Sequence, residues 1–294
     1  MKAQAISQSN RHSSRSTKGS KPKVRVPRGL GGRKRIGKYR IGGKIGEGNF
    51  ASVYKAMDTI EGTLVALKVP HDEYVTPESL ESFRREARMV SQLDHPNILP
   101  VKDADIIEQR FVIAFRLGEK SLDDRLRNRL SVAKAIEYSD QILAAVEHAH
   151  QKKVVHCDIK PENFILFSGD LLRLTDFGVA KVAQRTLRGS GTGTVGYMAP
   201  EQAMGRPSPR SDVFSIGLIM YRMFSGQWPE WPFEWPPAGY DRVRRRIHPD
   251  LIRLVKRAMD VHPRNRFRDA IHMRKEFLKL KRKSLRFAEQ RKSR

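Results

Sequence analysis

An aspartate, a lysine and an asparagine stand close together near the middle of the chain, at Asp158, Lys160 and Asn163. Asp158 could accept a hydrogen bond from an attacking hydroxyl, and Lys160 could stabilise negative charge on a phosphoryl group. Asn163 offers a side-chain oxygen to a metal ion, and Asp176 offers a carboxylate thirteen residues later. Hard oxygen ligands of this kind suit Mg²⁺ that is also bound to phosphates. The residue types and their spacing therefore indicate chemistry on a phosphoryl group.

A glycine-rich stretch lies upstream, where two predicted strands at 39–45 and 51–57 meet. Its sequence over 46–53 is Gly-Glu-Gly-Asn-Phe-Ala-Ser-Val, with Ala51 in place of a third glycine. Glycine lets backbone N–H groups approach phosphate oxygens with no Cβ in the way. By itself the stretch is more typical of an ordinary hairpin turn, so a phosphate-binding role depends on the other motifs.

A lysine, Lys68, ends a short apolar run, Val-Ala-Leu-Lys at 65–68. Glu86 follows 18 residues later, within a predicted helix that begins near Thr76 and continues to about Gln92. An ion pair between Lys68 and Glu86 would aim the ammonium at the α- and β-phosphates of a nucleotide. Without that carboxylate, a lysine on a sheet is usually a solvated side chain.

The predicted elements divide the chain into two parts around these motifs. Short apolar runs predict strands of a small antiparallel sheet at 39–45, 51–57, 64–70, 98–101 and 111–115. Beyond residue 121 the apolar periodicity becomes helical, and the mostly apolar segment 212–224 predicts a central buried helix. We therefore expect a small strand-rich lobe, a larger helical lobe and a cleft between them.

Further motifs follow in order along the second part. They are Asp-Phe-Gly at 176–178, Met-Ala-Pro-Glu at 198–201, Ser-Asp at 211–212 and Pro-Arg-Asn-Arg-Phe at 263–267. In this order and spacing the motifs resemble the protein kinase superfamily over residues 40 to about 272. The fold implied is α+β and two-lobed, with a small antiparallel β lobe carrying one helix before a larger, mainly helical lobe.

The resemblance implies a role for each matching residue. Asp158 and Lys160 are implied to be catalytic, and Asn163 and Asp176 to hold two Mg²⁺ ions, for which Mn²⁺ could substitute. The residues implied to bind ATP are Ile45, Gly46, Glu47, Gly48, Asn49, Phe50, Ala51, Ser52, Val53, Ala66, Lys68 and Glu86. The residues implied to be structural or regulatory are His156, Phe177, Gly178, Thr194, Glu201, Asp212 and Arg266.

The substrate class also follows from the resemblance. Lys160 after Asp158, and Gly-Thr-Val-Gly-Tyr at 193–197, resemble serine/threonine kinases more than tyrosine kinases. The motifs look most similar to bacterial eukaryotic-type kinases. We therefore expect transfer of the γ-phosphoryl of ATP to serine or threonine hydroxyls of protein substrates, with autophosphorylation, in signalling. A nucleotide-binding scaffold without activity is the first alternative, although such a protein usually lacks one of these residues.

Besides Ala51, two positions stand out against the family pattern. Cys157 stands where an arginine usually precedes the catalytic aspartate and binds an activation-loop phosphate. Phosphorylation at Thr186, Ser190 or Thr192 is therefore hypothesised not to be required for activity. Alignment of Ser121-Leu122 with the family pattern places Ala114 behind the adenine, where its small side chain would leave an open pocket.

Basic residues concentrate at the two ends of the chain. Residues 1–39 hold 12 Lys or Arg and no acid, and 274–294 carry a net charge of +8, which leaves +5 of the total +25 for 40–273. We expect a disordered basic tail over 1–38, a kinase domain over 39–272 with lobes at 39–115 and 118–272, and a basic extension over 273–294. The ends could contact acidic proteins, nucleic acid or an anionic membrane surface, or serve only as solvated tails. A second alternative for the whole chain is a binding module whose tails carry the function.

The apolar runs, the start of the sequence and the number of cysteines indicate in which cellular compartment the protein is expected. Apolar runs are too short for the roughly 20 residues that span a bilayer, so we expect no transmembrane segment. No apolar segment typical of a secretory signal follows Met1, and the single cysteine excludes an intrachain disulfide, so we expect a cytoplasmic protein. Three tryptophans, Trp228, Trp231 and Trp235, suggest either partner docking or packing of a loop onto the helical lobe.

Overall fold

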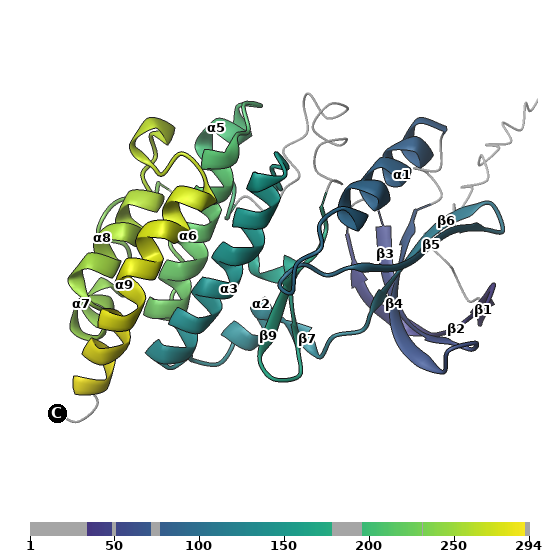
Figure 1. Cartoon of the computed structure of the whole chain (residues 1–294), viewed down its shortest axis with the longest axis horizontal. Coiled ribbons are helices and arrows are strands. Elements are labelled where there is room, and N and C mark those ends of the chain that lie inside the picture. The colour runs from purple at the N-terminus through teal and green to yellow at the C-terminus, as the bar shows by residue number, and fades with distance from the viewer. Residues whose placement is uncertain (1–33, 49–50, 72–76, 178–195, 231, 292–294) are drawn as a thin grey trace, which may run out of the picture.

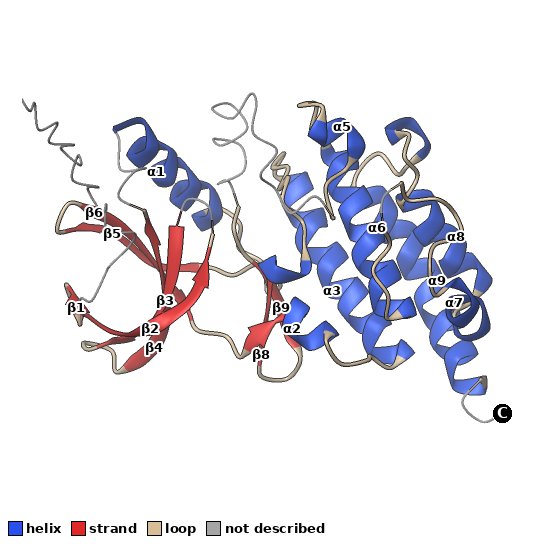
Figure 2. Cartoon of the chain, turned by 180° about the vertical axis from the view of Figure 1, so that it is seen from behind, coloured by secondary structure: helices blue, strands red, loops and turns tan. Residues whose placement is uncertain are grey.

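Two differently built parts lie side by side along the long axis of the molecule, a twisted sheet and a stack of helices (Figures 1 and 2). This arrangement comes from a computed structural model that describes residues 34–48, 51–71, 77–177, 196–230 and 232–291. The predicted α+β class and the order of a sheet-bearing lobe before a helical lobe are confirmed.

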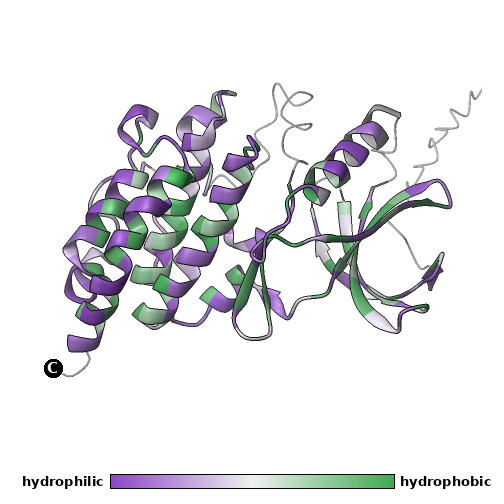
Figure 3. Ribbon diagram, viewed as in Figure 1, coloured by the Kyte–Doolittle hydropathy of each residue, from purple (hydrophilic) through white to green (hydrophobic). Residues whose placement is uncertain are grey.

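The first lobe is a six-stranded antiparallel sheet with the strand order β1-β2-β3-β4-β6-β5. Its strands are β1 (Arg35–Ile36), β2 (Tyr39–Glu47), β3 (Ala51–Asp58), β4 (Thr63–Pro70), β5 (Val101–Ile107) and β6 (Arg110–Arg116). Helix α1 (Pro77–Ser91) packs against β5 and β6 and is mostly hydrophilic, whereas the strands carry hydrophobic residues (Figure 3). Val65, Leu67 and Val69 alternate along β4 and are fully buried, because successive side chains of a strand point to opposite faces.

The second lobe surrounds one buried helix, α6 (Pro209–Ser225). The other helices are α2 (Leu122–Leu126), α3 (Val132–Gln151), α5 (Pro200–Ala203), α7 (Tyr240–Arg246), α8 (Pro249–Ala258) and α9 (Ala270–Gln290). Helix α6 contacts α3, α7, α8 and α9, and Ile216, Leu218 and Ile219 on it have no exposed surface. An apolar helix buried on every side is the arrangement that its sequence predicts.

A second, three-stranded sheet packs on the helical lobe at its border with the first lobe. It consists of β7 (Lys120–Ser121), β8 (Phe164–Phe167) and β9 (Leu171–Leu174). The main-chain N–H of Leu99 donates to the carbonyl of Leu174 at 2.9 Å, and the N–H of Leu174 donates to the carbonyl of Asn97 at 2.8 Å. The linker between α1 and β5 is therefore hydrogen-bonded to the helical lobe.

Helix α9 runs through the boundary that the sequence suggested at residue 272. It packs along α3, and Phe277 and Ala288 on its inner side are buried. Its basic residues also bind α3, since Arg274 forms ion pairs with Asp140 and Glu147 at 3.2 and 2.5 Å. The residues from 273 to 290 are thus packed into the helical lobe. The basic stretch 1–33 lies outside the described residues.

Two of the three tryptophans belong to the packing of the helical lobe. Trp228 lies edge-on to Tyr197, with ring centroids 3.6 Å apart, and Trp235 lies edge-on to Tyr240 at 5.4 Å. Both pack against the main hydrophobic core. Trp231 lies outside the described residues.

The buried position of Phe277 gives a stability test for α9. Phe277→Ala should lower the free energy of unfolding by about 3–5 kcal/mol, because it leaves a cavity under the helix. Leu278→Ala is the matched control, since Leu278 is 44% exposed and its removal should change stability little. Chemical denaturation followed by circular dichroism measures both, and equal small losses would contradict the packing of α9 as part of the domain.

Candidate active site

The loop between α3 and β8 brings Asp158, Lys160 and Asn163 together. The ammonium of Lys160 lies 2.9 Å from Oδ2 of Asp158. The amide of Asn163 donates to the same carboxylate oxygen at 3.0 Å and to the main-chain carbonyl of Asp158 at 2.7 Å. A proline at the start of the short helix η2 (Pro161–Asn163) fixes the chain between the lysine and the asparagine. The three side chains therefore form one hydrogen-bonded cluster.

A buried carboxylate on α6 holds the beginning of this loop. Asp212 is 1% exposed and accepts hydrogen bonds from the main-chain N–H groups of His156 at 2.8 Å and Cys157 at 2.9 Å. Cys157 has a φ of +64°, a left-handed conformation that non-glycine residues adopt rarely. Burial would raise the pKa of Asp212, but the hydrogen bonds from His150 and the main chain of His156 hold that pKa below its ordinary value. The ionised carboxylate thus maintains a strained loop backbone.

His150 is the third donor to Asp212. Its Nε2 lies 2.9 Å from Oδ2 of Asp212, and its Nδ1 accepts the main-chain N–H of Ala270 at 3.1 Å. Since Nδ1 accepts a hydrogen bond, the proton must be on Nε2, and the ring is neutral. His150 therefore connects the start of α9 to the carboxylate that holds the loop. The sequence analysis missed this residue, because nothing in the sequence distinguishes it from His148 in the same turn of α3.

His156 and Phe177 form a second support beneath the loop. Nδ1 of His156 accepts the main-chain N–H of Asp158 at 3.2 Å, and its Nε2 donates to the carbonyl of Thr175 at 3.0 Å. The ring of Phe177, which is 1% exposed, lies edge-on to the imidazole at 4.7 Å. The residue before Asp176 and the residue after it are thus both fixed to the loop that carries Asp158.

One ion pair crosses from the sheet to the helical lobe. Nζ of Lys68 on β4 lies 2.5 Å from Oδ1 of Asp176. Desolvation of Asp176 would raise its pKa, but Lys68 and, further away, His156 and Lys160 hold the pKa of this carboxyl below its ordinary value. Asp176 is therefore ionised at neutral pH. The side chain of Glu86 lies outside the described residues, so the predicted pair between Lys68 and Glu86 stays a prediction.

The glycine-rich stretch forms the hairpin end of β2 and β3. Gly46 is opposite Val53, and the N–H of Gly48 donates to the carbonyl of Ala51 at 2.9 Å. Ile45 is half exposed, and Ser52 contacts the ring of His71. Glu47 is opposite Ser52 in the register, whereas Asn49 and Phe50 lie outside the described residues.

The expectation that Ala114 lies behind the adenine is wrong in register. On β6, Ala114 is opposite Leu67 of β4, and both side chains pack with Val65 and Val69 in the core on the far face of the sheet. Ile113 is the residue opposite Lys68. A shift of one residue reverses the face of every side chain in a strand, which explains why a nearly correct alignment gave the wrong face.

The segment that follows residue 195 is fixed by a buried ion pair. Arg266 contacts Glu201 with both terminal nitrogens, at 2.8 and 3.0 Å, and its side chain has no exposed surface. Next to it, the amide of Gln202 donates to the carbonyl of Cys157 at 2.5 Å, a contact that the sequence analysis did not foresee. The predicted pairing of Glu201 with Arg266 is present. Gly178, Thr194, Thr186, Ser190 and Thr192 lie outside the described residues.

The oxygen atoms near Asp158 can be tested for their fit to a metal. Asn163 uses its amide nitrogen for both contacts to Asp158, which leaves its side-chain oxygen available, and Asp176 contributes an ionised carboxylate. No cluster of three or more His, Cys, Asp or Glu side chains suited to a metal occurs among the described residues. Mg²⁺ is commonly held by one or two protein oxygens together with phosphates and water, so this donor set fits Mg²⁺ bound with a nucleotide.

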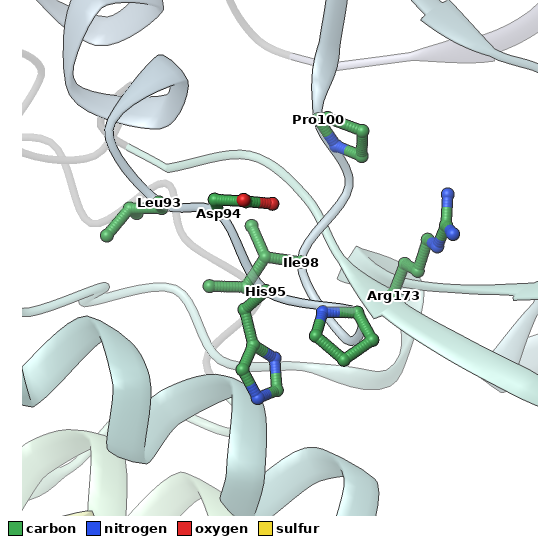
Figure 4. Close-up of a pocket in the computed structure, with 7 residues that line it drawn as sticks. Leu93, Asp94, His95, Ile98, Pro100 and Arg173 are labelled. Carbon is green, nitrogen blue, oxygen red and sulfur yellow. The ribbon is translucent and has the colours of Figure 1, made fainter.

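A separate cavity of about 280 Å³ lies beside the linker between α1 and β5. Figure 4 shows His95, Ile98 and Pro100 of that linker around it, with Arg173 of β9 on the other side. Asp158, Lys68 and Asp176 do not line it. The cavity is therefore distinct from the cluster described above.

Comparison with known protein families identifies the family to which the chain belongs. The family model described as "Protein kinase domain" matches residues 39–289. The chain belongs to the protein kinase family. The match includes most of α9, in agreement with its packing against α3, and the family implies the use of ATP and a divalent metal ion.

Curated relatives of this kinase are serine/threonine kinases. The chain is 35% identical over 65% of its length to a probable serine/threonine-protein kinase PknB of Lactococcus lactis, and 34% identical over 67% to PrkC of Bacillus subtilis. It is 35% identical over 66% to PknA of Mycobacterium tuberculosis. The matched parts make up 32%, 32% and 48% of those proteins, so the chain spans half or less of their lengths. The predicted similarity to bacterial eukaryotic-type kinases is confirmed.

A solved structure of similar fold is the kinase domain of PknI from Mycobacterium tuberculosis. It superimposes with a TM-score of 0.63 over 83% of this chain and 96% of that domain, at 23% sequence identity. The likeness supports the two-lobed fold. Within the described residues no helix has the length and apolar character needed to cross a bilayer.

The role of Asp212 can be tested by removing its charge. Asp212→Asn should lower the free energy of unfolding by about 3 kcal/mol or more, because the new amide would face main-chain donors. Asp241→Asn is the control, since Asp241 is 74% exposed and its one ion pair within the described residues is with Arg244 on its own helix. Denaturant titrations of the three proteins at pH 7 make the comparison.

The same comparison has a defined pH dependence. The pKa of Asp212 in the folded chain lies below the ordinary 3.8, so its stabilising effect is complete above about pH 4 and is lost as the pH falls further. The difference between wild type and Asp212→Asn should therefore be constant from pH 5 to 8 and narrow in acid. A difference that grows on acidification would contradict an ionised Asp212.

Proposed function

We propose that this chain is a serine/threonine protein kinase that transfers the γ-phosphoryl of ATP to serine or threonine hydroxyls of protein substrates, including its own. The observation that carries the proposal is the cluster of Asp158, Lys160 and Asn163 together with the ion pair between Lys68 and Asp176. Together these residues supply the carboxylates, the ammonium groups and the amide oxygen that phosphoryl transfer with a metal ion needs. The family match and the serine/threonine kinases among the relatives support it.

In this proposal the chain acts by positioning and electrostatics. Asp158 accepts a hydrogen bond from the attacking hydroxyl and aligns it with the phosphorus. Lys160, whose ammonium already lies beside Asp158, stabilises the charge that develops on the transferred phosphoryl group. Lys68 binds the α- and β-phosphates from the sheet side, and residues 46–53 cover them.

Asn163 and Asp176 are proposed as the metal-binding residues. Mg²⁺, or Mn²⁺ in its place, supplies positive charge that neutralises the phosphate oxygens. Asp158 orients Asn163 by accepting a hydrogen bond from its amide nitrogen. The residue that aligns the attacking hydroxyl therefore also sets the direction of the side-chain oxygen of Asn163. Lys68 keeps Asp176 ionised for this role.

The location and partners of the kinase are also proposals. An ATP-dependent reaction and a sequence with a single cysteine, the buried Cys157, favour a cytoplasmic site of action. The basic residues 1–33, which lie outside the described structure, are proposed to contact acidic proteins, nucleic acid or an anionic membrane surface. Protein substrates that carry serine or threonine are the partners of the catalytic site.

The proposed reaction is tested by phosphate transfer from labelled ATP with Mg²⁺, both to the chain itself and to a generic basic protein. Asp158→Asn should reduce the rate about 10²- to 10⁴-fold, because the hydroxyl loses its acceptor. Phosphoamino-acid analysis should find label on serine and threonine only. Asp241→Asn serves as the exposed control and should keep the wild-type rate. Undiminished transfer by Asp158→Asn, or label on tyrosine, would contradict the proposal.

Removal of the metal provides an independent test. Chelation with EDTA should abolish transfer, and added Mg²⁺ or Mn²⁺ should restore it. Nucleotide binding can be followed without catalysis by thermal denaturation, in which ATP should raise the Tm of the wild type only when Mg²⁺ is present. In Asn163→Ala this Mg²⁺-dependent increase should become smaller, and an unchanged increase would argue against Asn163 as a metal-binding residue.

A further inference from the structure

Four arginines gather on the helical lobe away from the active site. Arg242, Arg245 and Arg246 lie on α7, and Arg129 lies in the loop between α2 and α3. We call these four residues the arginine cluster. Arg129, more than burial or the charges of Arg246 and Arg245, lowers the pKa of Arg242, which shows that these charges repel one another.

The arginine cluster has no internal counter-ion in the described part of the chain. No carboxylate there forms an ion pair with any of its four members, and the nearest acid on α7, Asp241, pairs with Arg244 instead. Arg129 and Arg245 are exposed, and Arg242 and Arg246 are half-buried. A terminal nitrogen of Arg242 donates to the carbonyl of Ser225 at 3.1 Å, which fixes its position at the end of α6. The repulsion is therefore not relieved within the lobe.

Local helix energetics do not account for the whole cluster. Basic residues in the last turn of a helix interact favourably with its terminal carbonyls, which explains Arg245 and Arg246. Arg242 is in the first turn of α7, where positive charge is unfavourable, and Arg129 is on a different element. The concentration of charge at this place therefore requires another explanation.

We propose that the arginine cluster is a docking site for an acidic segment of a protein substrate. The inference rests on the proposed kinase function. Guanidinium groups bind carboxylates through paired hydrogen bonds, and several of them on a fixed backbone favour a run of Asp or Glu. The acidic segment supplies the counter-charge that the lobe itself lacks.

The position of the cluster connects it to the catalytic loop. Arg242 contacts Ser225 at the end of α6, and one turn earlier Arg222 contacts Asp123 of α2 at 2.8 Å. Helix α2 in turn packs against η2, the part of the catalytic loop that carries Asn163. A continuous series of packed elements thus leads from the catalytic loop to the cluster. A substrate with its hydroxyl at Asp158 could place a neighbouring acidic segment there.

The surface fits a short peptide better than nucleic acid. Three of the four arginines belong to a helix of seven residues, whose length is only about 10 Å. Single-stranded nucleic acid is usually held by a long basic groove with aromatic side chains for stacking. Two of the three tryptophans that precede α7, Trp228 and Trp235, pack against the core. The compact charge therefore favours an acidic peptide.

Two acceptor peptides that differ only in an appended run of glutamates test the proposal. The variant is R129Q/R245Q/R246Q, which keeps Arg242 because that residue also binds the end of α6. We expect the wild type to have a KM for the acidic peptide at least about tenfold below that for the plain peptide, and the variant to lose this difference. The kcat for both peptides and the KM for the plain peptide should stay unchanged.

A matched control removes the same number of charges elsewhere. Lys275, Arg282 and Arg286 are exposed on α9, and K275Q/R282Q/R286Q should keep the preference for the acidic peptide. Equal losses in the two triple variants would overturn the proposal, because general attraction to a basic protein would then explain the preference. An unchanged preference in R129Q/R245Q/R246Q would overturn it as well.

Direct binding separates this proposal from the proposed function. Fluorescence anisotropy with a labelled glutamate-rich peptide should show binding to Asp158→Asn protein, and this binding should weaken as salt is added. When Arg129, Arg245 and Arg246 are also replaced by glutamine, the affinity for the peptide should fall at least about tenfold. If this arginine-dependent peptide binding is observed but neither the wild type nor any variant transfers phosphate, the docking site stands and the proposed kinase function fails. If phosphate is transferred but the peptide does not bind, the docking site fails. If R129Q/R245Q/R246Q lost binding to a DNA duplex or to phosphatidylserine vesicles but still bound the glutamate-rich peptide, the docking-site proposal would also be overturned.

Discussion

A single buried carboxylate joins the elements on which the active site depends. Asp212 on α6 accepts hydrogen bonds from the catalytic-loop backbone and from His150 on α3, and His150 accepts one from the start of α9. An ionised group without partners would be very unfavourable at this depth, so its three donors must be held in place together. Three helices and the catalytic loop consequently have one arrangement in which this charge is satisfied, and that arrangement also sets the left-handed backbone at Cys157.

The other polar contacts of the site extend from this centre in two directions. Gln202 binds the carbonyl of Cys157, and its neighbour Glu201 is held by the fully buried Arg266. Toward the sheet, His156 fixes the main chain beside Asp176, and Asp176 binds Lys68. The reacting groups are thus placed by a hydrogen-bond network in which most contacts involve a main-chain atom, and Cys157 contributes its N–H and its carbonyl to this network.

The sequence predicted the class of fold, the order of its lobes and the groups that come together around Asp158, because each motif has a distinctive composition. It could not predict contacts that depend on register or on distant packing. Ala114 was assigned to the wrong face, since strand register is fixed only by pairing with β4. The boundary at 272 followed the excess of basic charge, whereas Phe277 and Ala288 bury one side of α9. His150 has no local signal, because its importance comes from Asp212 and Ala270, which are 62 and 120 residues away.

The hydrogen bonds between Leu174 and the linker at Asn97–Leu99 have a mechanical consequence. They attach the C-terminal end of α1 to the helical lobe, although α1 otherwise packs on the sheet. A rotation of the sheet relative to the helices that keeps these hydrogen bonds would therefore pivot near this linker. The C-terminal end of α1 would stay almost still, while its first turn would move through the widest arc. Glu86 lies between them and would move less than the first turn.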